Sequence, residues 1–228
     1  MAKKSRRYRE NLESLDLSRT YSLDEAVGAL KGLRPAKFDE TVEVVARLGV
    51  DPRKSDQMVR GAVSLPHGLG KTIRVVAFAE GDAADACKEA GAVEVGGEDL
   101  AKKIEGGWTD FDLVIAHPSM MRFVGKLGRT LGPKGLMPSP KSGTVAPDVA
   151  KAVADFVAGK VDFRVDSAGN VHVPVGKASF SADKLTEYAS ALLDYIVSLR
   201  PATAKGIYIQ NLSISTSMSP GLRVAYSY

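Results

Sequence analysis

Hydrophobic and polar positions alternate in the outer thirds of the chain, as they do in half-buried strands. Residues 41–49 place apolar side chains at every second position, which predicts a strand with one buried face. Similar patterns predict further strands at 59–65, 161–165, 170–175, 206–217 and 222–226. The segment 166–169 separates two of these strands and is typical of a hairpin turn. We therefore expect an antiparallel sheet.

Two helices are predicted in the same outer regions. Ser22 and Glu25 have the spacing of a capping box, which begins a short helix that Gly32 ends. Residues 181–199 form an amphipathic pattern that ends before Pro201. The outer thirds thus have the composition of an α+β domain.

The middle of the chain follows a different pattern. Residues 73–79 are almost continuously apolar, which is typical of a parallel strand covered on both faces. Further strands are predicted at 93–95 and 112–116, and helices at 82–90, 99–105, 118–131 and 147–158. This alternation of strands and helices predicts a small α/β, Rossmann-like, three-layer domain.

The change of pattern predicts two domains. Segments 1–67 and 160–228 are expected to form one discontinuous α+β domain with a split β-α-β-like antiparallel sheet, and 68–159 an inserted α/β domain. Two chain crossings follow, near 66–71 and at 159, where glycines give the backbone conformational freedom. The residues expected to act as hinges are Pro66, Gly68, Gly70 and Gly159.

Charge distribution favours a polyanionic partner for the outer segments. The whole chain carries a net charge of +4. Segment 1–67 has 13 basic and 10 acidic residues, 68–159 has 11 and 12, and 160–228 has 7 and 5. The two outer segments therefore carry a combined net charge of +5, and the middle segment carries −1. A positively charged outer domain would attract a polyanion such as a nucleic acid.

The sequence also argues against membrane or secreted proteins. It has no apolar run of roughly 18 or more residues, and no apolar segment follows the basic N-terminus, so we expect neither a membrane span nor a secretory signal. The single cysteine, Cys87, is expected to be a buried core residue in a reducing compartment.

No catalytic, metal or cofactor motif is present. The segment 68–72 has the letters GLGKT, but a phosphate loop needs glycine at position 65, which is Leu65, and should precede a helix. The three histidines are far apart, and no serine or cysteine lies in a nucleophile elbow. A nucleotide-dependent enzyme remains an alternative only through the α/β pattern, and we expect a non-enzyme without cofactor or metal.

The stretch 120–144 is basic and rich in glycine and proline. No acidic residue occurs between Asp112 and Asp148. The cations are Arg122, Lys126, Arg129, Lys134 and Lys141. Such a loop can follow a phosphate backbone, because glycine allows close approach, and it is equally compatible with a solvated loop of turns. Residues 125–128 also match the GXXG pattern of an RNA-binding loop, although four residues carry little specificity.

This stretch also carries a family resemblance. Residues 126–144, KLGRTLGPKGLMPSPKSGT, closely resemble the signature of the bacterial-type large-subunit ribosomal protein L-one family. Further matching segments are 36–43 (AKFDETVE), 65–71 (LPHGLGK), 172–177 (HVPVGK) and 217–220 (SMSP). The resemblance implies a two-domain fold whose first domain contains both termini.

The resemblance also implies function. A member of this family would bind large-subunit ribosomal RNA in the mobile stalk near the exit site and assist release of deacylated tRNA. It would also repress translation by binding its own mRNA. Such a protein is expected to be cytoplasmic on the ribosome and monomeric when free. An RNA chaperone acting outside the ribosome is the second alternative.

The family's RNA-binding positions fall on eight residues of this chain. They are Lys37, Phe38, Thr41, Glu43, Asn211, Ser217, Met218 and Ser219. We expect Lys37 to meet phosphate, Phe38 to offer a ring face or pack the loop, and the Thr41 and Ser217 hydroxyls to bond a 2′-hydroxyl. Asn211, Ser213, Ser215 and Ser217 recur at period two on one strand face, which suits RNA or plain solvent.

The chain departs from the family pattern at two positions. Ser217 stands where threonine is usual and keeps the hydroxyl, whereas Ser219 stands where glycine is usual. A side chain at that second position changes how closely RNA can approach the backbone.

Overall fold

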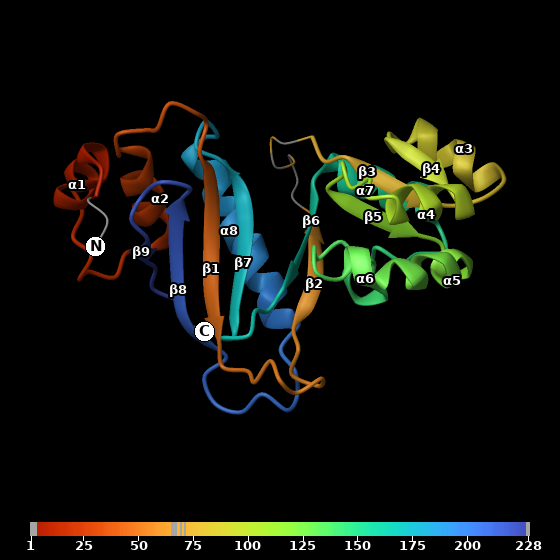
Figure 1. Cartoon of the computed structure of the whole chain (residues 1–228). Helices are drawn as coiled ribbons and strands as arrows, with labels where there is room; N and C mark the ends of the chain where they lie inside the picture. The colour runs from red at the N-terminus through yellow and green to blue at the C-terminus, as the bar shows by residue number, and fades with distance from the viewer. Residues whose placement is uncertain (1–3, 65–67, 69, 71, 227–228) are drawn as a thin grey trace. The chain divides into compact units, whose positions relative to one another are not determined.

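The structure is a computed structural model that describes residues 4–64, 68, 70 and 72–226. The chain forms two compact units (Figure 1), the first made of Met1–Leu65 and Phe163–Tyr228 and the second of Pro66–Asp162. The mixed α and β fold predicted from the sequence is confirmed.

The first unit is built on a four-stranded antiparallel sheet. Its strands are β1 (Thr41–Leu48), β7 (Asn170–Lys177), β8 (Ile209–Thr216) and β9 (Leu222–Arg223), in the order β7-β1-β8-β9. Alternate side chains such as Val42, Val44 and Ala46 are buried on one face of the sheet. The intervening residues point to the other face, where the two-residue period leaves them partly or fully exposed.

Two helices cover the buried face of this sheet. They are α2 (Leu23–Lys31) and α8 (Ala182–Ser198), which pack against each other and against the strands (Figure 1). The predicted capping box of α2 is present, with Ser22 and Glu25 each bonding the other's backbone N–H. A further helix, α1 (Arg6–Glu13), was not predicted from the sequence.

The predicted hairpin around 166–169 is wrong. Strand β6 (Lys160–Arg164) pairs with β2 (Arg60–Ser64) in a separate two-stranded sheet, whereas β7 pairs with β1. The Asp166 carboxylate accepts hydrogen bonds from the N–H groups of Ala168 and Asn170 at 2.9 and 2.7 Å. The backbone N–H groups of the turn are therefore bonded within the turn, and the chain passes from the β2–β6 sheet to the four-stranded sheet.

The second unit contains a three-stranded parallel sheet in the order β4-β3-β5. Its strands are β3 (Val75–Phe78), β4 (Glu94–Gly96) and β5 (Leu113–Ala116). All four residues of β3 are buried, as expected for a strand covered on both faces. The helices α3 (Asp82–Glu89) and α7 (Val149–Ala158) pack together, and α4 (Glu98–Glu105) packs with the helical segments after β5.

The single helix predicted at 118–131 is also wrong. The segment consists of short 3-10 and α-helical pieces, η1 (Pro118–Met120), α5 (Met121–Val124), η2 (Gly125–Leu127) and α6 (Gly128–Leu131). Gly125 and Gly128 begin two of these pieces, and glycine weakens continuous helix. The helix predicted from Pro147 begins later, because the Asp148 side chain caps α7. A last 3-10 turn, η3 (Pro140–Ser142), lies in the loop before α7.

The glycines at the two chain crossings have conformations that other residues rarely adopt. Gly68, Gly70 and Gly159 have φ angles of 69°, 67° and 117°. A Cβ atom on Gly159 would lie 2.3 Å from the Gly68 Cα, so the two backbones pass each other too closely for a side chain. Pro66, the other predicted hinge residue, lies outside the described residues.

Candidate RNA interface

A buried carboxylate organises the predicted RNA-binding residues of the first unit. Glu40 is only 4% exposed, yet four donors converge on it. Its Oε1 accepts from the Ala36 N–H at 2.8 Å and lies 3.5 Å from the Arg7 guanidinium. Its Oε2 accepts from the Thr216 hydroxyl at 2.5 Å and the Met218 N–H at 3.0 Å. One side chain therefore joins three segments that are distant in sequence.

The environment keeps Glu40 ionised. Burial acts to raise the pKa of its carboxyl, but the bonds from Thr216, Ala36 and Met218 and the nearby Arg7 charge outweigh it. The pKa is therefore lower than usual. A negative charge beside a candidate binding site for a polyanion would normally repel it. Here the Glu40 charge is buried and bonded to donors within the protein, so it does not face the site.

Two large apolar side chains are exposed on the segments that Glu40 holds. Phe38 is 56% exposed and Met218 is 49% exposed. Phe38 lies two residues after Ala36, and Met218 itself donates to the carboxylate. Lys37, next to Phe38, is also exposed. Phe38 is therefore not a core residue, and we call Lys37, Phe38 and Met218, on the two segments that Glu40 joins, the Phe38–Met218 surface.

The hydroxyl groups beside this surface have internal partners. Ser217 Oγ accepts from the Thr41 N–H at 3.1 Å and lies 3.4 Å from the Thr41 carbonyl oxygen. Thr41 Oγ1 accepts from the Lys177 ammonium at 3.0 Å, which leaves its own proton available to an outside acceptor. Ser219 Oγ accepts from the Thr216 N–H at 2.9 Å and donates to the Pro220 carbonyl oxygen. Ser217 and Ser219 therefore fix the loop.

The open face of the sheet continues from this end. Glu43 on β1 stands opposite Ser215 on β8, and Arg47 stands opposite the exposed Asn211. The His172 ring lies 3.3 Å from Glu43 through Nδ1 and 3.8 Å from Asp166 through Nε2. The face is polar, with small side chains on β8, and it presents both donors and acceptors.

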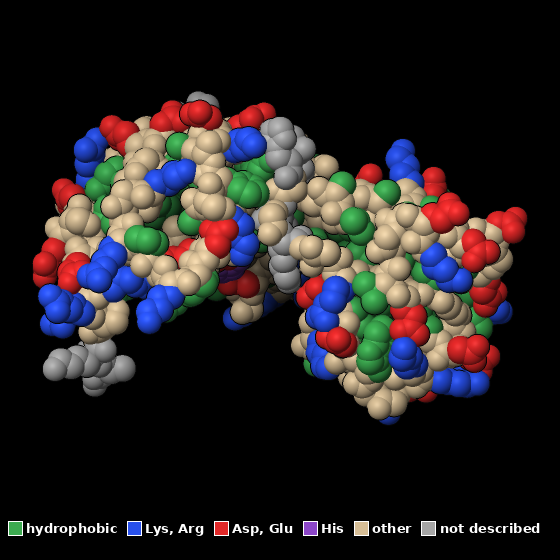
Figure 2. All heavy atoms as spheres, turned by 90° about the horizontal axis from the view of Figure 1, so that it is seen from above, with side chains coloured by type: hydrophobic (Ala, Val, Ile, Leu, Met, Phe, Trp, Pro, Cys, Tyr) green, Lys and Arg blue, Asp and Glu red, His purple; other side chains and the backbone are tan. Residues whose placement is uncertain are grey.

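The five predicted cations of the second unit are spread over short helical pieces. Arg122 lies on α5, Lys126 on η2, Arg129 on α6, Lys134 in the following turn and Lys141 on η3. All five are exposed. Lys134 bonds the Thr109 hydroxyl at 2.6 Å, and the Arg122 guanidinium lies over the Phe123 ring. Figure 2 shows acidic and basic side chains mixed on the surface of this unit.

Sequence reasoning missed three residues of the interface, namely Arg7, Glu40 and Lys177. A signal existed for Glu40, since the two-residue period puts position 40 on the same face as the buried Val42 and Val44. No local pattern identifies Arg7, whose partners Arg34, Glu40 and Met218 lie 27, 33 and 211 positions away in the sequence.

The part of the chain that the structure describes contains no group of three or more side chains suited to holding a metal ion. Within the same residues, no helix has the length and apolar character needed to cross a bilayer.

The sequence motifs and the mixed α and β fold agree with a ribosomal protein. The sequence profile of the Ribosomal protein L1p/L10e family matches residues 30–220, and the chain belongs to that family. It is therefore a ribosomal, cytoplasmic protein and not an enzyme. Among individual proteins, it is 54% identical over 224 residues to "Large ribosomal subunit protein uL1" of Mycobacteroides abscessus, a match that covers 98% of this chain and 95% of that protein.

Proposed function

We propose that this chain is a structural constituent of the large ribosomal subunit and that its first unit binds a structured segment of large-subunit ribosomal RNA. The name of the Mycobacteroides abscessus relative, a large ribosomal subunit protein, supports the assignment to the subunit. The observation that supports RNA binding is the Phe38–Met218 surface, two exposed apolar side chains on backbones fixed by the buried Glu40. A rigid, preordered surface loses little entropy on binding.

Each residue around this surface has a proposed role. Phe38 and Met218 contact the faces of bases or riboses, as aromatic and apolar side chains do in RNA complexes. Lys37, which is exposed, and Lys177, held beside Thr41, contact phosphates. The Thr41 hydroxyl proton bonds a 2′-hydroxyl or phosphate oxygen.

The neighbouring sheet face would extend the contact. Glu43 accepts hydrogen bonds from riboses or base amino groups, and Asn211 offers an amide to base edges. Ser217 and Ser219 act indirectly, since their hydroxyls hold the loop that carries Met218. Specificity would then come from the shape of this face more than from its net charge.

The second unit is proposed to make secondary contacts with RNA, including the tRNA in the exit site. Its cations are Arg122, Lys126, Arg129, Lys134 and Lys141, which are exposed. Exposed cations attract any phosphate backbone, so these contacts should tolerate sequence changes. We further propose motion of the two units about Gly68, Gly70 and Gly159, as a mobile stalk that assists release of deacylated tRNA would need.

Repression of the chain's own mRNA is part of the same proposal. An mRNA segment that presents the same shape as the ribosomal target would occupy the same Phe38–Met218 surface. The two RNAs should then compete, and a variant that loses one should lose the other in proportion.

Footprinting of purified large-subunit ribosomal RNA with the free chain tests the proposal. We expect protection of one structured segment, and loss of that protection in Phe38→Ala. Protection spread evenly along the RNA would instead favour an RNA chaperone, as would failure to co-sediment stoichiometrically with large subunits.

A shortened chain tests which unit binds. Residues 1–67 joined to 160–228 by a short Gly/Ser linker should keep most of the specific affinity. A fall to the non-specific range, roughly 10⁻⁴ to 10⁻⁶ M at physiological salt, would assign binding to the second unit instead.

A further inference from the structure

The N-terminal helix α1 is bound to the candidate RNA interface by two residues one turn apart. Ser5 caps the helix by accepting from the Tyr8 N–H at 3.2 Å. Arg7 and Asn11, at i and i+4, lie on the same helical face. Asn11 is 3% exposed, which is unusual for a polar residue in a helix of low overall hydrophobicity. The helix therefore has a defined docking face.

Asn11 fixes the position of the helix. Its side-chain N–H donates to the Arg34 carbonyl oxygen at 3.1 Å, and its side-chain oxygen accepts from the Arg34 N–H at 3.0 Å. The Asn11 side-chain amide therefore bonds both the backbone N–H and the backbone carbonyl oxygen of Arg34. Arg34 begins the segment that leads to Glu40, so α1 is docked in one register against this segment.

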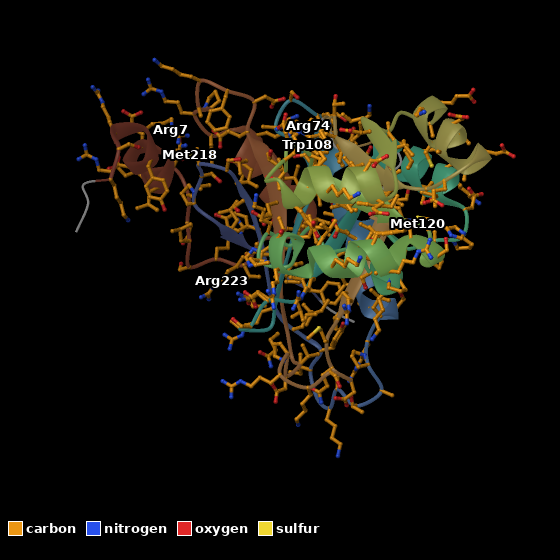
Figure 3. The ribbon with its side chains drawn as sticks, turned by 45° about the vertical axis from the view of Figure 1, so that its right-hand side comes forward. Arg7, Arg74, Trp108, Met120, Met218 and Arg223 are labelled. Atoms are coloured by element: carbon orange, nitrogen blue, oxygen red, sulfur yellow. The ribbon has the colours of Figure 1, made fainter. Side chains whose placement is uncertain are left out.

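Arg7 extends the same contact to Met218. Its Nη2 donates to the Met218 carbonyl oxygen at 3.0 Å, while its Nη1 lies 3.5 Å from Glu40 and 3.3 Å from the Arg34 carbonyl oxygen. Figure 3 shows Arg7 on α1 beside Met218. Because Glu40 accepts from the Met218 N–H, both backbone polar groups of Met218 are fixed by this ion pair.

We infer that Arg7 is a positioning residue for RNA binding and that α1, which lies outside the residues matched by the family profile, is part of the interface. The inference rests on the proposed binding of RNA by the first unit. Arg7 acts by holding Met218 in its exposed position, because the planar guanidinium reaches a carboxylate and a carbonyl oxygen at once.

A direct contact between Arg7 and phosphate is the main alternative. The Arg7 side chain is only 19% exposed, whereas Arg6 on the same helix is 87% exposed. Arg9 is also exposed. Figure 2 shows several Lys and Arg side chains, with acidic ones among them, at the end of the first unit, and exposed Arg6 and Arg9 would add general electrostatic attraction there. Any test must separate that attraction from positioning.

The experiment compares Arg7→Gln with Arg9→Gln, two changes that remove the same charge from the same helix. Dissociation constants are measured for the footprinted ribosomal RNA fragment at several salt concentrations, and urea unfolding is measured for each chain. We expect Arg7→Gln to weaken binding about tenfold more than Arg9→Gln, with equal salt slopes. Equal dissociation constants for the two variants would overturn the inference.

A double-mutant comparison identifies the residue through which Arg7 acts. If Arg7 works by holding Met218, Arg7→Gln should add little to the loss caused by Met218→Ala. If the fold-losses of affinity of the two single variants multiply in the double variant, Arg7 does not act through Met218. A salt slope reduced more by Arg7→Gln than by Arg9→Gln would likewise contradict positioning, because it would indicate a direct contact with phosphate. If the unmutated chain itself binds the fragment no better than unrelated RNA, the proposed function fails, which is a different outcome.

Arg7→Lys provides the same test if Arg7→Gln does not fold. Lysine keeps a positive charge near Glu40 but cannot reach the carboxylate and the Met218 carbonyl as a planar fork. We expect it to unfold cooperatively in urea and still to bind the fragment more weakly than the unmutated chain. Full affinity in a folded Arg7→Lys would show that the charge alone is sufficient.

Discussion

The two candidate RNA-contacting regions differ in how their charges are used. In the first unit, the Glu40 carboxylate and the Arg7 guanidinium are mostly buried and bonded to backbone groups that hold exposed apolar side chains. In the second unit, the cations of residues 120–144 are exposed on short helical pieces and in the turn after them. One region is arranged for shape, and the other offers charge to any polyanion.

The acidic neighbours of the second region strengthen this contrast. Glu98 on α4 pairs with Lys102, and the pKa of its carboxyl is lowered by that bond first and also by the Lys126 and Arg122 charges. The charges of Lys126 and Arg122 are therefore partly balanced by Glu98, although residues 120–144 contain no acidic residue. The charge of residues 120–144 taken alone therefore overstates the positive potential around that stretch.

The largest expected difference is between Glu40→Gln and Glu98→Gln. Glutamine at position 40 would present an N–H₂ group to donors such as Thr216 and the Met218 N–H, so buried groups would lose acceptors. We expect the free energy of unfolding in urea to fall by about 3–5 kcal/mol. Glu98→Gln, at an exposed pair, should leave it nearly unchanged. Similar losses for the two variants would remove the contrast.

The pH dependence of stability provides an independent check on Glu40. The folded pKa of Glu40 lies below its ordinary value of 4.5, so its stabilisation is present above about pH 4.5 and is lost as pH falls through the folded pKa. Urea unfolding should therefore show a gap between the native chain and Glu40→Gln that is constant near neutral pH and narrows below about pH 4.5. A gap of the same size at pH 3 would mean that Glu40 is not the titrating group.

The next effect concerns RNA affinity at constant stability. Phe38→Ala removes an exposed ring, so unfolding should change little, while specific RNA binding should weaken by about 1–3 kcal/mol if the ring contacts a base. Arg129→Ala in the second unit is the matched surface change. We expect it to weaken specific and unrelated RNA to the same small extent, as measured by direct titration with both RNAs. If Phe38→Ala weakened binding of both RNAs equally, Phe38 would not contribute to recognition of the specific RNA.

The sequence predicted most elements of the fold but few of the contacts that build the interface. Alternation located β1 and β8 to within a few residues, because the period of a half-buried strand is local information. Pairing is not local, and so β6 was assigned to a hairpin although its partner is β2, about 100 positions away. The glycines within 118–131 weaken helix formation, but this weak preference does not reveal where the helix breaks.

The candidate site shows the same division. Phe38 and Met218 were identified through family resemblance, since an exposed apolar residue has no distinctive pattern in sequence. Glu40 carried a local signal, as a carboxylate on the buried period of a strand, but its partners Thr216 and Met218 are 176 and 178 positions away. Only the fold brings Thr216 and Met218 to the Glu40 carboxylate and so forms the candidate interface.

A smaller effect should separate the two kinds of lysine in their response to salt. Lys37→Ala and Lys126→Ala each remove one exposed cation, so each should reduce the slope of log affinity against log salt by about one if it contacts phosphate. We expect the full reduction for Lys37 with the isolated ribosomal RNA fragment, and for Lys126 a smaller reduction that is the same with the fragment, with tRNA and with an unrelated RNA. Titrations at four or more salt concentrations measure both slopes. Identical slopes for the two variants with each RNA would show that both lysines serve the same contact.

The smallest expected effect concerns the glycines of the second unit. A Cβ at Gly128 would meet nothing within 4 Å, and its backbone is helical, so Gly128→Ala should raise the free energy of unfolding by about 0.5–1 kcal/mol. Gly132→Ala is the matched control, because a Cβ there would lie 2.5 Å from the Gly128 carbonyl oxygen and should destabilise the chain. Urea unfolding measures both changes. If Gly128 allows close approach of a phosphate backbone, the stabilised Gly128→Ala chain should bind tRNA more weakly, whereas unchanged binding would identify this stretch as a solvated loop of turns.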